Sequence, residues 1–232
     1  MRAVQVEPPA ELGTRDGLAY ALFLPDGESA GGVVMVHGAG SQKENQFDVA
    51  RALRAVGVAS VCYDQRGHGE SEGALGAGAL DDVATIAELL PPGRVALRGS
   101  SMGGFIALMA STRMDVAAVV AICPATSALL ERGLREGRFS FRADHDGLTA
   151  LLESSDEAAA AAALGERLLI LHAEGDEQVP VASSRELHAA APGSRLVAVP
   201  GGHHQSIQHD GEMVALVVRF LTRALRPHAA PE

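Results

Sequence analysis

The chain contains 232 residues, of which 47% are hydrophobic and 21% are charged, and its formal net charge is −10. This length and composition predict one globular domain that spans residues 1–232 and buries its own core. The negative charge is spread over both halves, which argues against a nucleic-acid partner because phosphate contacts need clustered lysine and arginine.

The N-terminal residues 1–17 lack the apolar core that a secretion signal requires. No later segment reaches the roughly 18 uninterrupted apolar residues of a membrane span. The sequence therefore predicts a cytoplasmic protein without a membrane partner.

Short β-rich runs alternate along the chain with longer stretches of helical apolar spacing. The predicted strands are 18–25, 32–38, 58–64, 94–100, 116–124, 167–173 and 195–200, and the predicted helices lie near 44–56, 79–90, 102–112, 181–191 and 211–225. This alternation predicts an α/β fold, a mostly parallel sheet with helices on both faces. We expect the first run, 18–25, to be an antiparallel edge strand.

Residues 127–166 break the alternation and form a connection about twice the usual length. The segment predicts an inserted lid of short helices, and a solvated excursion without a role in substrate binding is the alternative. Arg135, Arg138 and Arg142 could attract an anionic substrate group, but an acidic protein offers many partners for them, which favours solvated surface.

A G-x-S-x-G motif, Gly99 to Gly103, follows the predicted strand 94–100 and opens a predicted helix. A tight strand-to-helix turn of this kind lifts its central hydroxyl above the sheet, and the glycines remove clashing side chains. The centre is Ser101, a candidate nucleophile. The alternative register, centred on Ser100, would need a glycine where Arg98 stands.

A nucleophilic serine needs a base to accept its proton, and the base needs a third group to hold its tautomer. Asp176 follows the predicted strand 167–173, and His203 and His204 follow the last predicted strand. The carboxyl ends of parallel strands meet at one edge of a sheet, so we expect these side chains to lie near Ser101. Asp176 could also be an ordinary turn or helix-cap carboxylate.

The chain resembles the α/β hydrolases of the serine-esterase branch, including lysophospholipase-like members and the short form of dienelactone hydrolases. VMVHGAG (34–40) resembles the family's strand-three turn, and YDQRGHGESEG (63–73) resembles its D-x-R-G-H-G-x-S loop. HAEGDEQVP (172–180) resembles H-G-x-x-D-x-x-V-P, with Ala173 in place of the glycine. Dienelactone hydrolases use cysteine, and haloalkane dehalogenases and epoxide hydrolases use aspartate, at the position of Ser101.

The resemblance implies a catalytic acid at Asp176 and a base in GGHHQSIQHD (201–210). Matching the two glycines to those of relatives assigns the base to His204, whereas relatives with glycine directly before the base point to His203. The oxyanion hole is expected at the backbone N–H groups of Ala39, by resemblance, and of Met102, which follows the nucleophile.

These residues predict a serine hydrolase that cleaves small carboxylic esters through an acyl-enzyme on Ser101, without metal or organic cofactor. A thioesterase or acyltransferase would use the same triad, and a non-catalytic binding module on this fold is the remote alternative. An aromatic content of 3% favours an aliphatic pocket, and a homodimer through an edge strand or the last helix stays open.

The remaining histidines and the cysteines have structural interpretations. His37 and His68 lie in glycine-rich turns that they would brace by hydrogen bonds, and His172 would support the acid loop. Cys62 and Cys123 lie in or beside buried strands and are expected to be reduced thiols that pack as small hydrophobes. The spacing of His209 and its neighbours matches no specific metal site, and Asp210 is expected to cap the final helix.

Overall fold

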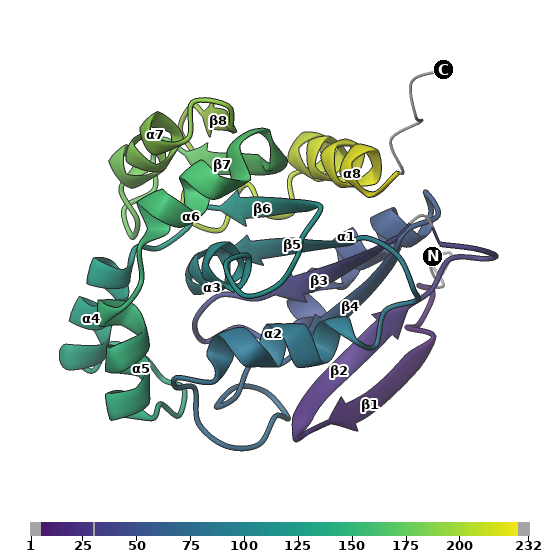
Figure 1. Ribbon diagram of the computed structural model, residues 1–232, viewed down its shortest axis with the longest axis horizontal. Coiled ribbons are helices and arrows are strands. Elements are labelled where there is room, and N and C mark those ends of the chain that lie inside the picture. Colours follow the sequence, from purple (N-terminus) through teal and green to yellow (C-terminus); the bar gives the residue numbers. More distant parts are fainter. Residues whose placement is uncertain (1–5, 30, 227–232) are drawn as a thin grey trace, which may run out of the picture.

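The computed structural model describes residues 6–29 and 31–226, and its centre is an eight-stranded sheet (Figure 1). The strands are β1 (Glu11–Arg15), β2 (Leu18–Phe23), β3 (Gly32–Val36), β4 (Ala59–Tyr63), β5 (Val95–Ser100), β6 (Ala118–Ile122), β7 (Leu168–Ala173) and β8 (Arg195–Val199). Their order in the sheet is β1-β2-β4-β3-β5-β6-β7-β8. β2 is antiparallel to both of its neighbours, and the other neighbouring pairs are parallel. The predicted α/β class is confirmed.

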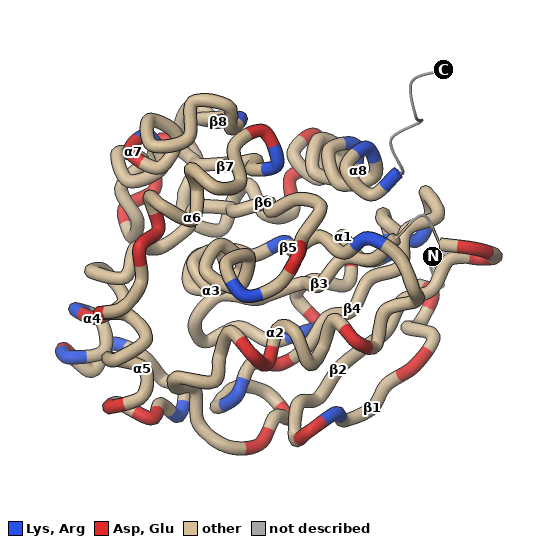
Figure 2. The backbone as a smooth tube through the Cα atoms, in the orientation of Figure 1, with Lys and Arg blue, Asp and Glu red and all other residues tan. Residues whose placement is uncertain are grey.

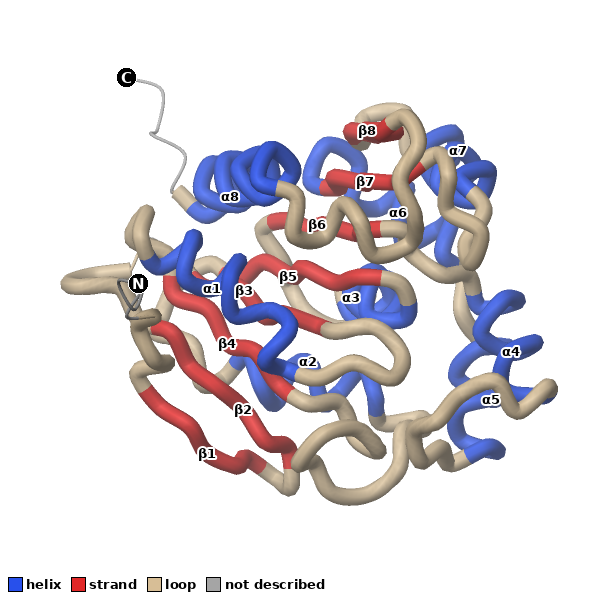
Figure 3. The backbone as a smooth tube through the Cα atoms, turned by 180° about the vertical axis from the view of Figure 1, so that it is seen from behind, coloured by secondary structure: helices blue, strands red, loops and turns tan. Residues whose placement is uncertain are grey.

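Helices cover both faces of the sheet, as the strand–helix alternation predicts. One face carries α1 (Phe47–Arg54) and α8 (Gly211–Leu225), which lie in front of the sheet in Figure 3. The other face carries α2 (Ala79–Ala87), α3 (Met102–Ala110), α6 (Glu157–Leu164) and α7 (Val181–Ala190). Two short 3₁₀ helices, η1 (Lys43–Gln46) and η2 (Gly165–Arg167), complete these connections.

The central strands are buried on both faces because each has its own apolar layer on either side. Successive residues of β3 show this: Val34 joins the core beneath α2 and α3, and Met35 joins the core beneath α1 and α8. Both side chains are fully buried. The absence of polar alternation in these runs is therefore the expected signature of a strand between two helical layers.

β1 is a strand that the sequence analysis did not predict, and it displaces β2 from the edge of the sheet. The two strands form a hairpin through Asp16 and Gly17, whose φ angles of 49° and 78° suit a two-residue turn that follows the twist of the strands. The expected antiparallel direction of β2 is correct, but its expected edge position is wrong. β1 escapes an apolar-run search because it is largely exposed, with Leu12 at 65%.

The connection 127–166 contains α4 (Ser127–Arg135), α5 (His145–Glu153) and α6. α4 and α5 pack together beyond the carboxyl ends of β5 and β6, whereas α6 packs on α3 and α7 in the helical layer (Figure 1). We call α4, α5 and the loop 136–144 between them the cap. No helix in the described part of the chain is both long enough and apolar enough to cross a membrane.

Candidate active site

The turn from β5 into α3 holds Ser101 in a strained conformation. Its φ is 53° and its ψ is −121°, and it lies directly before the first residue of α3. A Cβ on Gly99 would lie 2.0 Å from the carbonyl oxygen of Gly103, so only glycine permits this close crossing. Ser100 is buried, whereas Ser101 is half-buried and reachable.

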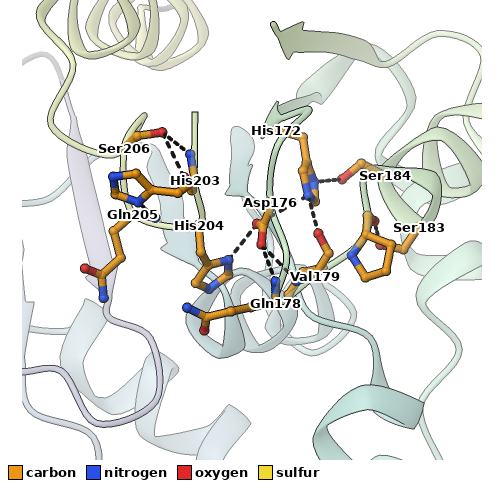
Figure 4. A network of polar contacts seen from close by, with 11 residues as sticks. His172, Asp176, Gln178, Val179, Ser183, Ser184, His203, His204, Gln205 and Ser206 are labelled. Carbon is orange, nitrogen blue, oxygen red and sulfur yellow. Dashed lines mark hydrogen bonds and ion pairs between the residues drawn. The ribbon is translucent and has the colours of Figure 1, made fainter. Parts of the chain in front are cut away.

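Asp176 and His204 form a close pair at the carboxyl ends of β7 and β8 (Figure 4). His204 Nδ1 donates to Asp176 Oδ2 at 2.6 Å, and the backbone N–H groups of Gln178 and Val179 donate to Oδ1 at 2.9 Å each. Burial by itself raises the pKa of Asp176, but the N–H of Val179 and the imidazole of His204 outweigh it, and the pKa is lowered. The aspartate is therefore held as an anion that fixes the His204 tautomer.

The neighbouring histidine has a different environment. His203 is exposed, and its backbone N–H and carbonyl oxygen both bond to Ser206 Oγ, at 2.9 and 2.8 Å. Figure 4 shows the His203 ring on the side of the loop away from Asp176. Of the two expected candidates, the structure brings only His204 to the aspartate.

Ser101 is connected to this pair through the end of β6. Its N–H donates to the carbonyl of Ile122 at 2.9 Å, and the Sγ atom of the next residue, Cys123, lies within 4.8 Å of both the Asp176 and His204 ligand atoms. Within the described residues, the Ser101 hydroxyl makes no hydrogen bond. Such bonds are often long without substrate and tighten when the substrate is present.

Two backbone amides belong to segments that lie close to Ser101. Met102 is the first residue of α3, where an N–H group has no acceptor within the helix. The turn that holds Ala39 is close, because a Cβ built on Gly38 would lie 3.3 Å from Ser101 Cβ. Neither the Met102 nor the Ala39 N–H is bonded to an acceptor in the described part of the chain.

His37 braces the Gly38–Ala39 turn, as the sequence predicted. Its Nε2 accepts the Gln65 N–H at 3.0 Å, which leaves Nδ1–H to donate to the Gly38 carbonyl at 2.7 Å. The side chain of Gln65 also donates to the His37 carbonyl at 2.6 Å. Burial lowers the pKa of His37 to about 4, so the ring is neutral near pH 7. It is a weak base there, because its accepting nitrogen, Nε2, is already bonded to the Gln65 N–H.

The D-x-R-G-H-G-x-S loop fixes the segment that follows the Ala39 turn. Asp64 accepts the backbone N–H of Lys43 at 2.7 Å and its ammonium at 2.9 Å, and the ammonium also pairs with Glu70. Burial alone lowers the pKa of Lys43, but its ion pairs with Glu70 and Asp64 outweigh burial and raise it, so it stays charged. A Cβ at Gly69 would lie 2.2 Å from the Asp64 carboxylate, which explains the second glycine of the motif.

The cap is joined to the same loop by backbone bonds and by stacked rings. Leu75 N–H donates to the Arg142 carbonyl at 2.9 Å, and Asp144 N–H donates to the Leu75 carbonyl at 2.9 Å. The Phe141 ring stacks on His68 with centroids 4.4 Å apart, and Phe139 stacks on Phe141 at 5.1 Å. His68 in turn meets the His37 ring edge to face. The cap therefore reaches the turn of Ala39 through a series of packed rings.

The cap arginines are engaged by the protein itself. Arg135 pairs with Glu131 and Arg138 pairs with Glu136, and Arg142 donates to the Ser71 carbonyl. Basic and acidic positions are interspersed along α4 and the loop after it (Figure 2). This arrangement agrees with the favoured interpretation of solvated surface.

The two thiols and the acid loop agree with their structural interpretations. Cys62 and Cys123 are both free and buried. His172 donates from Nε2 to the Val179 carbonyl at 2.9 Å, and its Nδ1 accepts from Ser184 at 2.7 Å. These two bonds join the loop that holds Asp176 to α7. Asp210 accepts the first free N–H groups of α8, as expected for its cap.

Cys123, Asp176 and His204 offer the one group of metal-ligand atoms found among the described residues. The Asp176 and His204 atoms lie 2.6 Å apart, closer than the roughly 3.3 Å between two ligands at tetrahedral zinc. That spacing fits a hydrogen bond and does not fit two ligands of one metal ion.

A cavity of about 380 Å³ opens beside His204. Its polar lining comes from the loop after β7, which holds Asp176, and from the loop after β8, which holds His204. The lining residues are Gly175, Glu177, Gln178, Gly202, His203, His204 and Gln205.

Three buried polar residues near the site were not found from the sequence: Lys43, Gln65 and Arg98. Lys43 and Gln65 stand in loops where polar residues are unremarkable. Arg98 could have been recognised from the sequence, because it is a charged residue inside the predicted apolar strand 94–100. A buried charge lowers stability unless it has a polar partner.

This combination of fold and site is that of an α/β hydrolase. Residues 27–142, half of the chain, match the family described as serine aminopeptidase, S33, and residues 150–231 match the family described as TAP-like protein. The chain therefore belongs to the serine aminopeptidase S33 family of α/β hydrolases, and the expected membership of the α/β-hydrolase superfamily is confirmed.

Similar proteins include enzymes and uncharacterised chains. Two uncharacterised proteins of Mycobacterium tuberculosis, from strains CDC 1551 and H37Rv, are each 27% identical over 222 residues, covering 90% of this chain and 77% of theirs. Est1E from Butyrivibrio proteoclasticus, solved with ferulic acid bound, has a TM-score of 0.72 at 19% identity, over 93% of this chain and 99% of that one.

Two further solved structures have the same fold. A monoacylglycerol lipase of Paleococcus ferrophilus has a TM-score of 0.69 at 22% identity, over 90% of this chain and 98% of that one. Mouse alpha/beta hydrolase domain-containing protein 10 has a TM-score of 0.65 at 19% identity, over 92% and 96% of the two chains. At these identities the likeness establishes the fold, and the substrate must be argued from the site.

Proposed function

We propose that this protein is a serine hydrolase that cleaves small carboxylic esters through an acyl-enzyme on Ser101. The observation that carries the proposal is the strained Ser101, half-exposed at the start of α3, on the same sheet edge as the bonded Asp176–His204 pair. Strain of this kind is retained where a function needs it, and here it presents a hydroxyl beside two unpaired amides.

Each group has a defined role in the proposed reaction. His204 accepts the Ser101 proton while Oγ attacks the ester carbonyl, and Asp176 holds the imidazole and stabilises its charged form. The N–H groups of Ala39 and Met102 bind the oxyanion of the tetrahedral intermediate. His204 then protonates the leaving alcohol. In the second half of the reaction it takes a proton from the attacking water and returns that proton to Ser101 Oγ as the bond to the acid breaks.

Thioesters or another acyl acceptor would use the same groups, and so would the amide bonds that the family description suggests. A cytoplasmic location and a homodimer stay predictions from the sequence. A non-catalytic binding module has no feature of the site in its favour.

The first experiment is labelling with an active-site fluorophosphonate, combined with turnover of short-chain aryl esters, aryl thioesters and aminoacyl aryl amides. We expect labelling and ester turnover that Ser101→Ala abolishes. Ser100→Ala is the matched control, because it removes the same hydroxyl from the adjacent buried position, and it should retain labelling. Equal labelling of Ser101→Ala would contradict the proposal.

The second experiment compares two adjacent histidines. His204→Ala should lower kcat by several orders of magnitude, because loss of a triad base leaves only binding and the oxyanion donors. His203→Ala should stay within about threefold of the wild type, because its ring is exposed and bonds neither Asp176 nor Ser101. The reverse pattern would move the base to His203.

A further inference from the structure

Arg98 is a buried cation directly behind the candidate active site. It lies on β5, three positions before Ser101, and is only 1% exposed. No carboxylate in the described part of the chain forms an ion pair with it, and its Nε has no hydrogen-bond partner there. A buried charge without an ion pair costs stability, and an apolar residue at this strand position would avoid that cost.

The guanidinium contacts two separate segments. One terminal nitrogen, Nη1, donates to the Gln46 side-chain oxygen, and Nη2 donates to the backbone carbonyl of Gln208 at 3.1 Å. Gln46 is buried at the end of η1, the helix that follows the Ala39 turn. Arg98 therefore bridges the segment of one oxyanion donor and the loop of the base.

His204 is the first residue, and Gln208 the last, of the turn that precedes α8. Residues 204–208 form one continuous turn before α8, so the Gln208 carbonyl lies at the opposite end of that turn from the imidazole. Asp176 fixes the first end through its 2.6 Å bond to His204. The side chain of Ile207 is buried among apolar residues beneath α8, and Arg98 supplies the directional bond at the second end.

The other end of the bridge is also fixed. η1 is held by the buried pair between Lys43 and Asp64, so Gln46 is a firm anchor. Arginine suits this position because its planar group presents several donors in fixed directions, whereas a lysine ammonium at the same site would be a single shorter donor group.

Resting on the proposed function, we propose that Arg98 is a positioning residue that ties the His204 turn to the oxyanion-hole segment and so sets the base relative to Ser101. It does not touch the reacting atoms. Its effect is geometric, because proton transfer from Ser101 requires hydrogen-bond distance and a misplacement of about 1 Å costs on the order of 100-fold in rate.

The main test is Arg98→Met, which keeps an unbranched side chain but removes every donor. We expect kcat for an aryl ester to fall about 10- to 100-fold with KM nearly unchanged, and fluorophosphonate labelling to slow similarly. The proton on His204 Nδ1, which is hydrogen-bonded to Asp176, should give a downfield NMR resonance, and its chemical shift should change in the variant. This measurement does not depend on turnover. Arg98→Lys keeps the charge without the bridge and should not restore kcat.

Arg167→Met is the matched control, because Arg167 also donates to backbone carbonyls, of Val116 and Ala163. It is the last residue of η2, directly before β7, and so lies at the end of that strand opposite to the site. It should leave kcat and the His204 resonance unchanged. Gln46→Met removes only the η1 end of the bridge, and should lower kcat in the same direction even if Arg98→Met does not fold.

Several results would overturn the inference: full kcat in folded Arg98→Met, full kcat in Gln46→Met where Arg98→Met does not fold, restoration by Arg98→Lys, or an unchanged His204 resonance. The wild type separates this failure from failure of the proposed function. If the wild type labels and turns over, and Ser101→Ala does not, an active Arg98→Met refutes only the bridge.

Discussion

At the scale of single residues, backbone conformation distinguishes groups with identical side chains. Ser100 and Ser101 have the same hydroxyl, but Ser100 ends β5 and is buried, while Ser101 has a φ of 53° and is half-exposed. His203 and His204 share an imidazole but differ in surroundings, since His203 is exposed and only the buried His204 bonds Asp176. The position of each residue in its turn therefore decides which serine is accessible and which histidine bonds the aspartate.

Cys123 tests how strongly burial controls a reactive group beside the site. Burial raises the pKa of its thiol to about 12, and the side chain is 1% exposed although its Sγ lies close to His204. The thiolate is the reactive form, so a thiol reagent such as a disulfide dye should label no cysteine in the native protein. Both Cys123 and Cys62 should react fully in denaturant.

Cys62 is the internal control for this labelling, because it is equally buried but does not belong to the group of Cys123, Asp176 and His204. Cys62→Ser and Cys123→Ser assign any reaction to one thiol. Rapid native labelling of Cys123 that inactivates the enzyme would show that the thiol is reachable through the site, contrary to its burial.

Local motifs could be predicted from the sequence, whereas buried polar bridges could not. The glycine spacing around Ser101 is a local requirement, because the crossing of Gly99 and Gly103 needs glycine within a few residues. Arg98 and Gln46 are separated by 52 positions, and Lys43 and Asp64 by 21. Such partners are found only after the strands are placed side by side.

At the scale of elements, the missed strand has a physical explanation. β1 has few apolar side chains because it pairs at the edge of the sheet and faces water, so an apolar-run search favours β2 alone. The usable signal was Asp16-Gly17, since a two-residue turn with both φ values positive favours this pair. Turn chemistry identifies exposed hairpins better than hydropathy does.

The cap depends on packing between aromatic rings, and Phe141 is its central contact. The ring lies between His68 and Phe139 and is 9% exposed. Phe141→Ala should lower stability by about 3 kcal/mol and loosen the exposed loop around Arg138. Trypsin should then cleave after Arg138 on the order of tenfold faster than in the wild type, because local opening becomes easier.

Phe47→Ala is the control for that measurement. Phe47 is the first residue of α1, on the face of the sheet opposite to α2 and α3, and its ring packs edge to face on Phe23 with centroids 5.1 Å apart. It should reduce stability without the early cleavage after Arg138. If both variants are cleaved at the same site at the same rate, the rings do not hold the cap.

At the scale of the whole molecule, the parallel sheet gathers the site from distant parts of the chain. β3, β5, β7 and β8 all end at the edge where the Ala39 turn, Ser101, Asp176 and His204 stand. The sequence predicted this gathering because parallel strands end together. The cap could not be placed in the same way, since nothing in residues 127–166 indicates that only α4 and α5 leave the helical layer.

The stability of the whole fold should fall as the pH is lowered through the range of histidine. Burial holds the pKa of His37 near 4 in the folded protein, below the ordinary value of 6.5. As the pH falls, the unfolded chain therefore binds the proton before the folded protein does. The stability that the neutral His37 ring contributes is fully present above pH 6.5 and is lost as the pH falls toward 4. Between pH 7.5 and 5, His37 alone should cost about 2 kcal/mol. His68 and His172, whose pKa values burial also lowers, act in the same direction.

Denaturant unfolding at pH 7.5 and pH 5 measures this loss, and His37→Gln isolates the contribution of one ring. Glutamine can accept the Gln65 N–H that His37 Nε2 accepts, but it does not titrate. At pH 7.5 the variant should be less stable than the wild type, because glutamine does not reproduce the packing of the ring. On going to pH 5, its free energy of unfolding should fall by about 2 kcal/mol less than that of the wild type. Asp176 does not confuse the comparison, because its pKa is lowered from 3.8 and its contribution is lost only at more acidic pH. An equal loss in both proteins would show that His37 is not the neutral brace of the Ala39 turn.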